Sequence, residues 1–456
     1  MNKFLSAIIL SVFSLYAQAQ SADSVMMRRI YNEALTRGKC YENLDYLSNK
    51  IGGRLSGSPQ AQRAVEYTYD VLKSYGFDSV YLQEVMVPHW VRGAKEQGMI
   101  VKGTQQIPVR ICALGNSIAT PKEGLRAPII EVRNFKELEA IGSERIKGKI
   151  VFFNRPMDPT HITTGRAYGE AGDQRGSGAI EAAKYGAVGV VVRSLTLAND
   201  TNPHTGMMRY VDSIPKIPAC AISTTDADEL SRLLKMRSAA VVSFFFKQNC
   251  EMLPDVKSYN VIAEMLGSEK PEEIIVAGGH LDSWDNGDGA HDDGAGVTQS
   301  MEALRLLKQL GYTPKRTLRC VLFMNEENGV RGGIKYAEEA SGTKHIAAIE
   351  SDAGGFTPRG FGVDDLPTIA FMQKWVPLFQ PYSIDWIKQG WGGTDIGPLK
   401  KHGTVLIGYT PDSQRYFDYH HTAIDTFDKV NKRELELGAA AISSMLYLLS
   451  EYGIGR

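Results

Sequence analysis

The chain has little cysteine and no excess of either charge sign, and both shortages restrict what it can be. Its five cysteines, at positions 40, 112, 220, 250 and 320, are an odd number at irregular spacings. The sequence therefore predicts no disulfide framework and at most one or two bridges, with Cys320 as a reduced core residue of a strand. The formal net charge of −1 gives no reason to expect nucleic acid or an anionic membrane surface as a partner.

Apolar runs of transmembrane length, internal repeats and low-complexity tracts are also missing. Residues 1–19 have the layout of a secretory signal, with Lys3, an apolar region from Phe4 to Tyr16 and a small-residue cleavage site at 17–19. A membrane anchor is the alternative, but this run is too short to span a bilayer. We therefore expect a secreted or periplasmic protein that starts near Gln20 and has no membrane attachment after cleavage.

What is present indicates a soluble globular protein of two domains. Hydrophobic residues make up 43% and charged residues 23% of 456 residues, a length that exceeds what one core usually organises. A helix start at Ser58-Pro59 and a strand pattern over 80–87 open the chain. Residues 111–247 carry glycine-punctuated strands and short helices, which indicates a small mixed α/β unit. The alternative is a continuation of the main sheet, but an edge-like strand restarting at 258–263 favours an insertion.

Two apolar strand patterns each end in side chains suited to catalysis. The first ends in two glycines before His280, and the second ends just before Glu326 and Glu327. Asp292 lies between them, ahead of an amphipathic helix pattern. Because open α/β sheets place their sites at the carboxyl ends of strands, we expect these side chains at one edge of a sheet.

A further carboxylate and two adjacent imidazoles follow. Asp352 comes after another predicted strand, and His420 and His421 precede Thr422. Histidines combined with carboxylates and without cysteine suit divalent ions of hard to borderline character, zinc above all. Five histidines lack such neighbours and are expected to be ordinary surface or core residues: His89, His161, His204, His345 and His402.

These residues belong to motifs that occur in a characteristic order. They read Gly-Gly-His-Leu-Asp-Ser-Trp-Asp, Asp-Asp-Gly-Ala-Gly, Asn-Glu-Glu, Glu-Ser-Asp-Ala-Gly and His-His-Thr-Ala-Ile-Asp-Thr, starting at residues 278, 292, 325, 350 and 420. With them the chain resembles the di-zinc exopeptidase family of aminopeptidases and glutamate carboxypeptidases. The resemblance implies an α/β fold, a mixed sheet flanked by helices, in residues 20–110 and 248–456. It also implies that residues 111–247 are an inserted, smaller α/β protease-associated domain.

Matching the motifs one by one implies a ligand set for two zinc ions per chain. Asp292 would bridge the ions, His280 and Asp352 would complete one, and Glu327 and His421 would complete the other. A bridging carboxylate suits two ions about 3.5–4 Å apart. The peptide bond after Asp292 is cis in such relatives, so we expect it to be cis here.

The same resemblance implies roles beside the metals. Glu326 would be the general base for a water between the ions, and His420 would hydrogen-bond the tetrahedral oxyanion. The opposite assignment, with His420 rather than His421 as the ligand, remains an alternative. Because metal ligands need groups that orient them, Asp282, two residues after His280, is expected to accept a hydrogen bond from the free ring nitrogen of that histidine. Asp395 lies in a stretch that matches another motif of the family, which implies that it supports the site.

The function implied is that of a secreted zinc-dependent exopeptidase acting on dipeptides and short peptides. The alternatives are an aminopeptidase on longer peptides and a non-catalytic, receptor-like protein of the same fold. Peptide termini need charged partners, acidic for the ammonium group and cationic for the carboxylate. Candidates near the motifs are Glu350 and Asp285 for the first and Arg331, Lys388 and Arg415 for the second. Relatives further suggest a homodimer.

Overall fold

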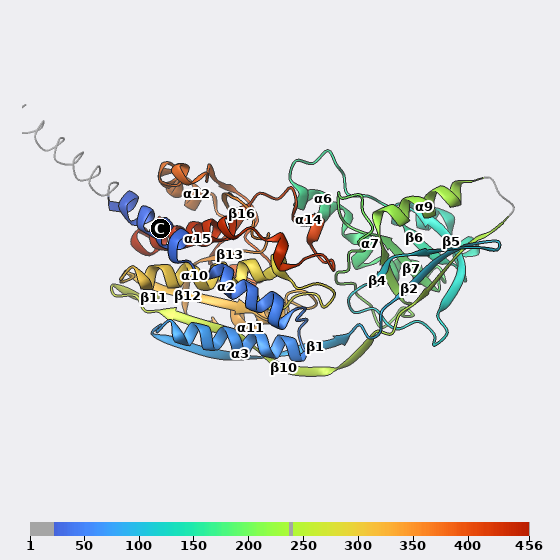
Figure 1. The fold of residues 1–456 in the computed structure, drawn as a ribbon, viewed down its shortest axis with the longest axis horizontal. Helices are drawn as coiled ribbons and strands as arrows, with labels where there is room; N and C mark the ends of the chain where they lie inside the picture. The colour runs from blue at the N-terminus through green and yellow to red at the C-terminus, as the bar shows by residue number, and fades with distance from the viewer. Residues whose placement is uncertain (1–21, 237–239, 456) are drawn as a thin grey trace, which may run out of the picture.

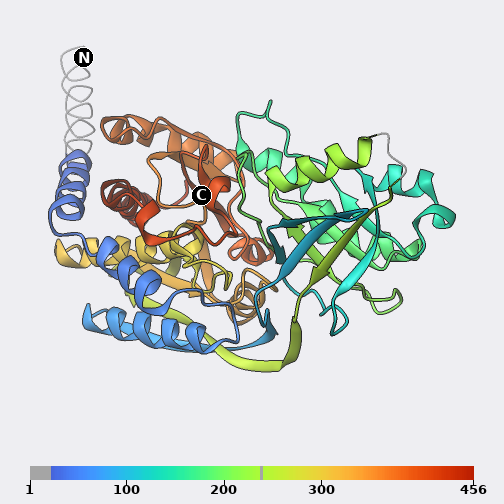
Figure 2. The ribbon, with the colours of Figure 1, turned by 45° about the vertical axis from the view of Figure 1, so that its right-hand side comes forward.

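The computed structural model describes residues 22–236 and 240–455. The predicted signal segment, residues 1–19, lies outside the described residues. The described chain forms two bodies, each built on an eight-stranded mixed sheet with helices packed on it (Figures 1 and 2). This arrangement confirms the predicted α/β fold class.

The first sheet carries the motifs and has the strand order β1-β10-β12-β11-β13-β16-β14-β15. Its centre is parallel, because β11 (Lys270–His280) pairs with β12 (Arg316–Phe323) and β13 (Lys344–Glu350), and β13 pairs with β16 (Val405–Pro411). The carboxyl ends of these four strands therefore meet at one edge of the sheet. The outer strands are β1 (Ser79–Val91), β10 (Glu251–Met265), β14 (Pro358–Val363) and β15 (Trp386–Gln389).

Helices cover both faces of this sheet and close the first body. α10 (Ala295–Gln309) and α15 (Lys432–Tyr452) pack against each other and against β11 and β12, with α2 (Cys40–Asp45) beside them. α11 (Arg331–Glu339) lies on the opposite face with η5 (Gly397–His402). The other helical segments are residues 22–37, η1 (Tyr46–Ile51), α3 (Pro59–Ser74), η2 (Ala290–Gly294), α12 (Leu366–Met372), η3 (Gln373–Trp375), α13 (Val376–Phe379), η4 (Gln380–Tyr382), α14 (Tyr416–Tyr419) and η6 (Phe427–Lys429).

Local sequence signals explain where several of these helices begin. The Ser58 side chain accepts a hydrogen bond from the Ala61 N–H at 3.1 Å, so the predicted start at Ser58-Pro59 is confirmed. Asn431 caps α15 in the same way, because its side-chain oxygen accepts from the N–H groups of Arg433 and Glu434. These caps fix the entry of the chain into α3 and α15.

The second body spans residues 97–247, and its sheet has the order β3-β2-β9-β5-β6-β7-β8-β4. Its strands are β2 (Gln97–Lys102), β3 (Gln105–Val109), β4 (Ile111–Ala113), β5 (Leu125–Val132), β6 (Ile150–Phe153), β7 (Gly189–Arg193), β8 (Ala219–Ile222) and β9 (Val242–Lys247). Its helices are α4 (Phe135–Ile141), α5 (Ser143–Ile146), α6 (Thr164–Ala171), α7 (Asp173–Gly176), α8 (Gly178–Lys184) and α9 (Thr224–Lys235). Because β2 and β3 precede residue 111, this sheet begins earlier than the boundary expected for the insertion.

The two bodies are joined through one long antiparallel pair, β1 with β10 (Figure 2). The chain leaves the first body along β1 and returns along β10, so both crossings lie side by side. The register of this pair shifts between Val87 and His89. The bodies are thus tethered by paired backbone rather than by two separate loops.

The remaining composition-based expectations concern cysteines and surface. All five cysteines are free and buried, including Cys320 in β12, which confirms its predicted reduced state.

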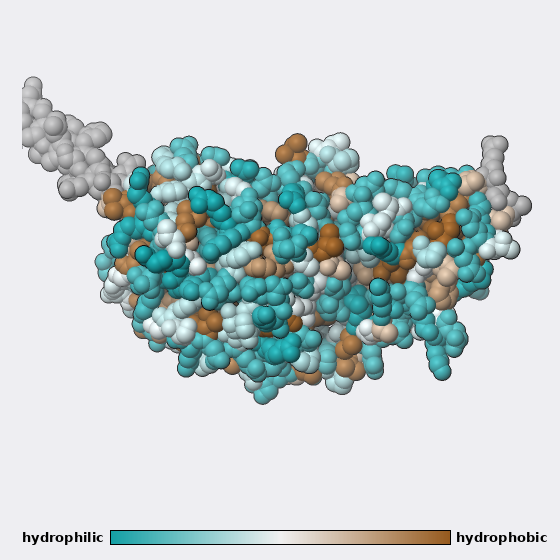
Figure 3. Space-filling view, viewed as in Figure 1, coloured by the Kyte–Doolittle hydropathy of each residue, from teal (hydrophilic) through white to brown (hydrophobic). Residues whose placement is uncertain are grey.

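Within the described ranges, no helix combines the length and the apolar character that crossing a bilayer requires. The face in Figure 3 is mainly hydrophilic, with apolar side chains in small separate groups.

The packing of α10 against the sheet yields a stability prediction. Leu304 on this helix is fully buried in the main core, whereas Lys308, one turn later, is exposed. Leu304→Ala should lower the free energy of unfolding by about 2–5 kcal/mol through the lost apolar contacts and the cavity. Lys308→Ala is the matched control and should leave the urea midpoint unchanged. An unchanged midpoint for Leu304→Ala would contradict this packing.

Candidate metal centre

The five predicted ligand residues meet at the carboxyl edge of the first sheet. Asp292 lies between two histidine rings: its Oδ1 is 3.2 Å from His280 Nε2, and its Oδ2 is 3.3 Å from His421 Nε2. Asp352 Oδ1 lies 3.6 Å from His280 Nε2, and Glu327 Oε2 lies 3.1 Å from His421 Nε2. Each histidine therefore has a carboxylate of its own and shares Asp292 with the other.

These atoms fit a metal ion by their chemistry and their burial. Nitrogen and oxygen atoms come within 4.8 Å of one another in three overlapping sets: Asp292 with His420 and His421, His280 with Asp293 and Asp352, and His280 with Asp292 and Glu327. His280 Nε2 and Asp292 Oδ2 are buried and have no hydrogen-bond partner among the described residues. A buried polar atom without a hydrogen-bond partner is energetically costly. Imidazole and carboxylate atoms that lie close together without such partners therefore suit zinc coordination.

The loop around Asp292 is held by a second carboxylate. Asp293 accepts hydrogen bonds from the N–H of His280 at 3.0 Å and from the N–H of Gly296 at 2.9 Å. Its oxygens are therefore engaged by backbone, which separates its role from that of Asp292. The peptide bond between Asp292 and Asp293 is cis, as expected.

The geometry favours His421 over His420 as a ligand. The two rings are stacked with centroids 3.5 Å apart, and His420 Nε2 lies 3.7 Å from Asp292 Oδ2. His421 is nearer to Asp292 and also reaches Glu327, whereas His420 has one carboxylate at longer range. Burial and the neighbouring His420 hold the pKa of His421 well below its ordinary value, which keeps its ring neutral and able to bind a metal. The assignment itself stays a prediction.

Residues of the second body hold the backbone of both histidines and the ring of His421. His421 Nδ1 donates to the Thr205 carbonyl at 3.3 Å, and the Thr205 N–H donates to the His421 carbonyl at 3.0 Å. His204 Nδ1 donates to the His420 carbonyl at 2.8 Å. His421 has a φ of 65°, a backbone conformation that residues other than glycine adopt only when the surrounding structure holds them there. His204, expected to be an ordinary surface or core residue, is buried and belongs to none of the candidate ligand sets, but its ring supports the backbone next to the site.

A turn after β12 presents the two glutamates. Asn325 has a φ of 77°, and the Asp282 carboxylate accepts from the N–H groups of Asn325 at 2.7 Å and Glu326 at 3.0 Å. Burial, followed by the nearby carboxylates of Asp352 and Asp292, raises the pKa of Glu326 to about 7. The turn thus allows consecutive glutamates to face the same site.

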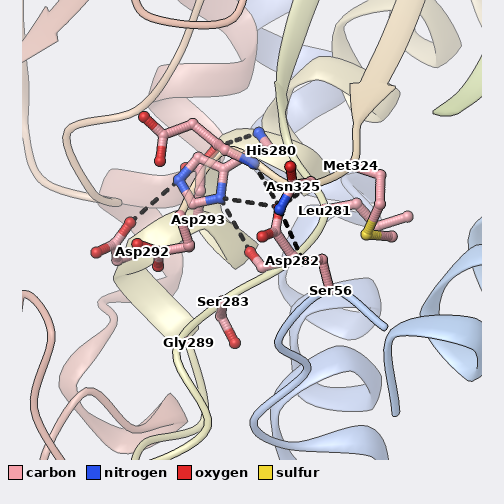
Figure 4. A network of polar contacts seen from close by, with 12 residues as sticks. Ser56, His280, Leu281, Asp282, Ser283, Gly289, Asp292, Asp293, Met324 and Asn325 are labelled. Carbon is pink, nitrogen blue, oxygen red and sulfur yellow. Dashed lines mark hydrogen bonds and ion pairs between the residues drawn. The ribbon is translucent and has the colours of Figure 1, made fainter. Parts of the chain in front are cut away.

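The contact predicted between Asp282 and His280 exists, but through a different atom. His280 Nδ1 donates to the backbone carbonyl of Asp282 at 2.9 Å, while the nearest carboxylate oxygen is 3.9 Å away (Figure 4). The carboxylate is directed instead to the N–H groups of the turn after β12. Asp282 therefore fixes the first histidine with its backbone and the glutamate turn with its side chain.

Asp395 lies close to the site but is not hydrogen-bonded to a proposed ligand. Both of its carboxylate oxygens are buried without a hydrogen-bond partner in the part of the chain that the structure describes. Burial, and then the neighbouring Glu350 and Glu326, raises its pKa well above the ordinary value. Its loop is tied to the end of β13, because Glu350 accepts from the N–H groups of Thr394 at 2.7 Å and Ile396 at 2.9 Å.

The predicted anchors for peptide termini have other partners. Both oxygens of Glu350 accept backbone hydrogen bonds, and Asp285 is held by Arg92 at 2.6 Å. The three predicted cationic anchors contact groups of their own: Arg331 pairs with Asp255, Lys388 lies over the Trp386 ring, and Arg415 donates to the Tyr419 hydroxyl. These contacts weaken all five assignments.

A cation that sequence patterns did not indicate lies beside His421. Arg175 of α7 stacks over the Tyr168 ring and donates to its hydroxyl at 2.6 Å. A Cβ on Gly206 would be 2.5 Å from Arg175 Cζ and 2.7 Å from His421 Nδ1, so only this glycine separates the two side chains. Among the described residues no carboxylate forms an ion pair with Arg175. Its place in the other body explains why no local pattern revealed it.

Comparisons with known proteins agree with this geometry. Residues 260–446 match the family model described as Peptidase family M28. Carboxypeptidase Q of Bos taurus is 36% identical over 435 residues, which cover 94% of this chain and 89% of that protein. The crystal structure of a peptidase M28 precursor from Shewanella amazonensis SB2B has a TM-score of 0.90 at 35% identity, covering 94% of this chain and 97% of the other. BSAP, a zinc aminopeptidase from Bacillus subtilis, shares the fold with a TM-score of 0.64 at 19% identity, covering 91% and 95%.

The two adjacent histidines can be distinguished by metal binding. His421→Ala should weaken zinc binding because it removes a ring that faces both Asp292 and Glu327. His420→Ala is the matched control and should retain the zinc content of the unmodified protein. Zinc per chain, measured after dialysis against a weak chelator, separates the two. Loss of zinc from His420→Ala alone would reverse the assignment.

Proposed function

The chain belongs to peptidase family M28 and is a metallo-exopeptidase, and we propose that it hydrolyses dipeptides and short peptides with two zinc ions. The observation that carries the proposal is the position of Asp292, whose two oxygens face His280 and His421. Asp352 and Glu327 would complete the two coordination spheres. The likeness to carboxypeptidase Q over most of both chains supports the peptide substrate class.

Glu326 would perform the proton transfers. Zinc ions held by this site would lower the pKa of a water and polarise the scissile carbonyl. Glu326, with a pKa raised to about 7 by burial and by neighbouring carboxylates, accepts the proton of the attacking water and returns it to the leaving amine. Burial lowers the pKa of His420 and keeps its ring neutral, and this ring would donate a hydrogen bond to the oxyanion.

Dipeptide specificity requires that the substrate carboxylate find a cation near the metals. Arg175 supports this, because its guanidinium has no carboxylate partner among the described residues and adjoins His421 across Gly206. An aminopeptidase acting on longer peptides is the second candidate, supported by the fold shared with a zinc aminopeptidase. A non-catalytic receptor is disfavoured, because the ligand residues and Glu326 are all present.

Location and assembly complete the proposal. The signal-like residues 1–19 support secretion or a periplasmic location, and the family resemblance supports a homodimer. The proposed binding partners are peptide substrates. The nearly neutral net charge of −1 gives no support to nucleic acid binding.

Paired glutamate variants test the division of roles. Glu326→Gln should keep zinc and lose most of kcat, on the order of 10²-fold or more, because an amide cannot accept the proton. Glu327→Gln should instead weaken zinc binding, because an amide is a poorer ligand. Steady-state rates and zinc content are measured for both. Near-normal turnover by Glu326→Gln would place the base elsewhere.

Blocking the ends of one dipeptide tests the substrate proposal. The free dipeptide should be cleaved, and both its N-acetylated and C-amidated forms should react much more slowly. Arg175→Met should raise KM for the free dipeptide while leaving the slow amidated substrate little changed. Equal rates on the amidated form would indicate an aminopeptidase, and equal rates on the acetylated form a carboxypeptidase without need of a free amine.

A further inference from the structure

A fully buried arginine supports the loop between two proposed zinc ligands. Arg54, between η1 and α3, is 0% exposed. Its Nε donates to the Leu281 carbonyl at 2.7 Å, its Nη1 to the Asp288 carbonyl at 2.9 Å and its Nη2 to the Gly289 carbonyl at 3.0 Å. All three carbonyls belong to the segment that joins β11 to η2. The guanidinium therefore binds both ends of that loop.

Backbone contacts add to this grip. The Arg54 N–H donates to Ser283 Oγ at 3.2 Å, and the Ser283 N–H donates to the Arg54 carbonyl at 3.4 Å. Gly289 has a φ of 58°, and a Cβ there would lie 3.0 Å from Arg54 Nη1. Figure 4 shows Ser283 and Gly289 on this loop, near His280 and Asp292.

The charge of Arg54 is not used in a close ion pair. No carboxylate lies within ion-pair distance of its guanidinium among the described residues, although burying a cation costs several kcal/mol when nothing compensates. Burial lowers the pKa of Arg54, and the carboxylates of Asp425, Asp293 and Asp282 oppose that effect from further away. The cation thus interacts with these carboxylates only at longer range, while its N–H groups donate to the carbonyls of the loop.

We propose that Arg54 is a positioning residue of the metal centre, whose planar fork holds the loop so that His280 and Asp292 face the same point. This inference rests on the proposed function, because it takes those two residues as zinc ligands. A loop fixed before the ion arrives avoids the ordering cost that a mobile loop would add to binding. Groups that orient ligands typically contribute 10- to 100-fold to metal affinity or activity.

Two substitutions separate the effect of the guanidinium geometry of Arg54 from the effect of its charge. Arg54→Lys keeps the charge but cannot reach three carbonyls, and Arg54→Met removes both. We expect the zinc Kd, measured by competition with a chromophoric chelator, to rise about 10- to 100-fold in Arg54→Lys and at least as much in Arg54→Met. The visible spectrum of the Co²⁺-loaded protein should also shift, because that spectrum reports ligand geometry independently of activity.

Arg316→Lys is the matched control. Arg316 is also buried and donates to Glu273 and to the Ser450 carbonyl, but it lies at the amino end of β12. Its replacement should lower stability while zinc affinity and the Co²⁺ spectrum remain those of the unmodified protein. A general loss of stability would affect both arginines alike.

The possible results distinguish a failure of the proposed function from a failure of the role proposed for Arg54. Failure of the unmodified protein to bind zinc would contradict the proposed function itself. Zinc binding by the unmodified protein and equally tight binding by Arg54→Lys and Arg54→Met would overturn only the role of Arg54, as would an equal loss in Arg316→Lys. If Arg54→Met does not fold, Arg54→Lys and Ser283→Ala decide, since unchanged affinity in both overturns the inference.

Discussion

Burial of several carboxylates at one edge of a sheet is the constraint on which the rest of the structure depends. Asp292 lies between the rings of His280 and His421, Asp352 lies near the first ring and Glu327 near the second. Glu326 and Asp395 are buried close by. Like charges that share a buried site repel one another and lose hydration, so each carboxylate needs a compensating group or has its pKa raised. Asp395, whose oxygens have no hydrogen-bond partner among the described residues, is of the second kind. Backbone N–H groups, histidine rings and the buried Arg54 provide that compensation.

This requirement explains why distant segments converge. Parallel strands bring His280 and the glutamate turn to one edge, and the loop after β16 brings the adjacent histidines over it. The segment before α3 contributes Arg54 from one side, and the second body contributes Thr205 from the other. The site is consequently assembled from segments that lie far apart in the sequence.

Sequence patterns could predict the parts of this arrangement that depend on local chain chemistry. His280, Asp292 and Glu326 follow or precede strong strand and helix signals, and the ordered motifs carried the family resemblance that supplied their proposed roles. The patterns could not show that Asp282 would use its backbone carbonyl toward His280, because that choice depends on the N–H groups of a turn far along the chain. Nor could they reveal Thr205 or Arg54, whose contacts cross between segments. Likewise β2 and β3 are assigned by strand pairing, which a local pattern does not contain.

The hydrogen bonds between Thr205 and His421 have a consequence for how the chain can be divided. The second body is continuous in sequence and has its own sheet and hydrophobic cores, as an independent domain would. Yet the backbone that fixes the His421 ring belongs to it, and the tether of β1 with β10 carries both connections. A shortened protein that retained every proposed ligand but lacked residues 97–247 would still lack the acceptor that orients one of them. The catalytic unit is therefore defined by this contact and extends across both bodies.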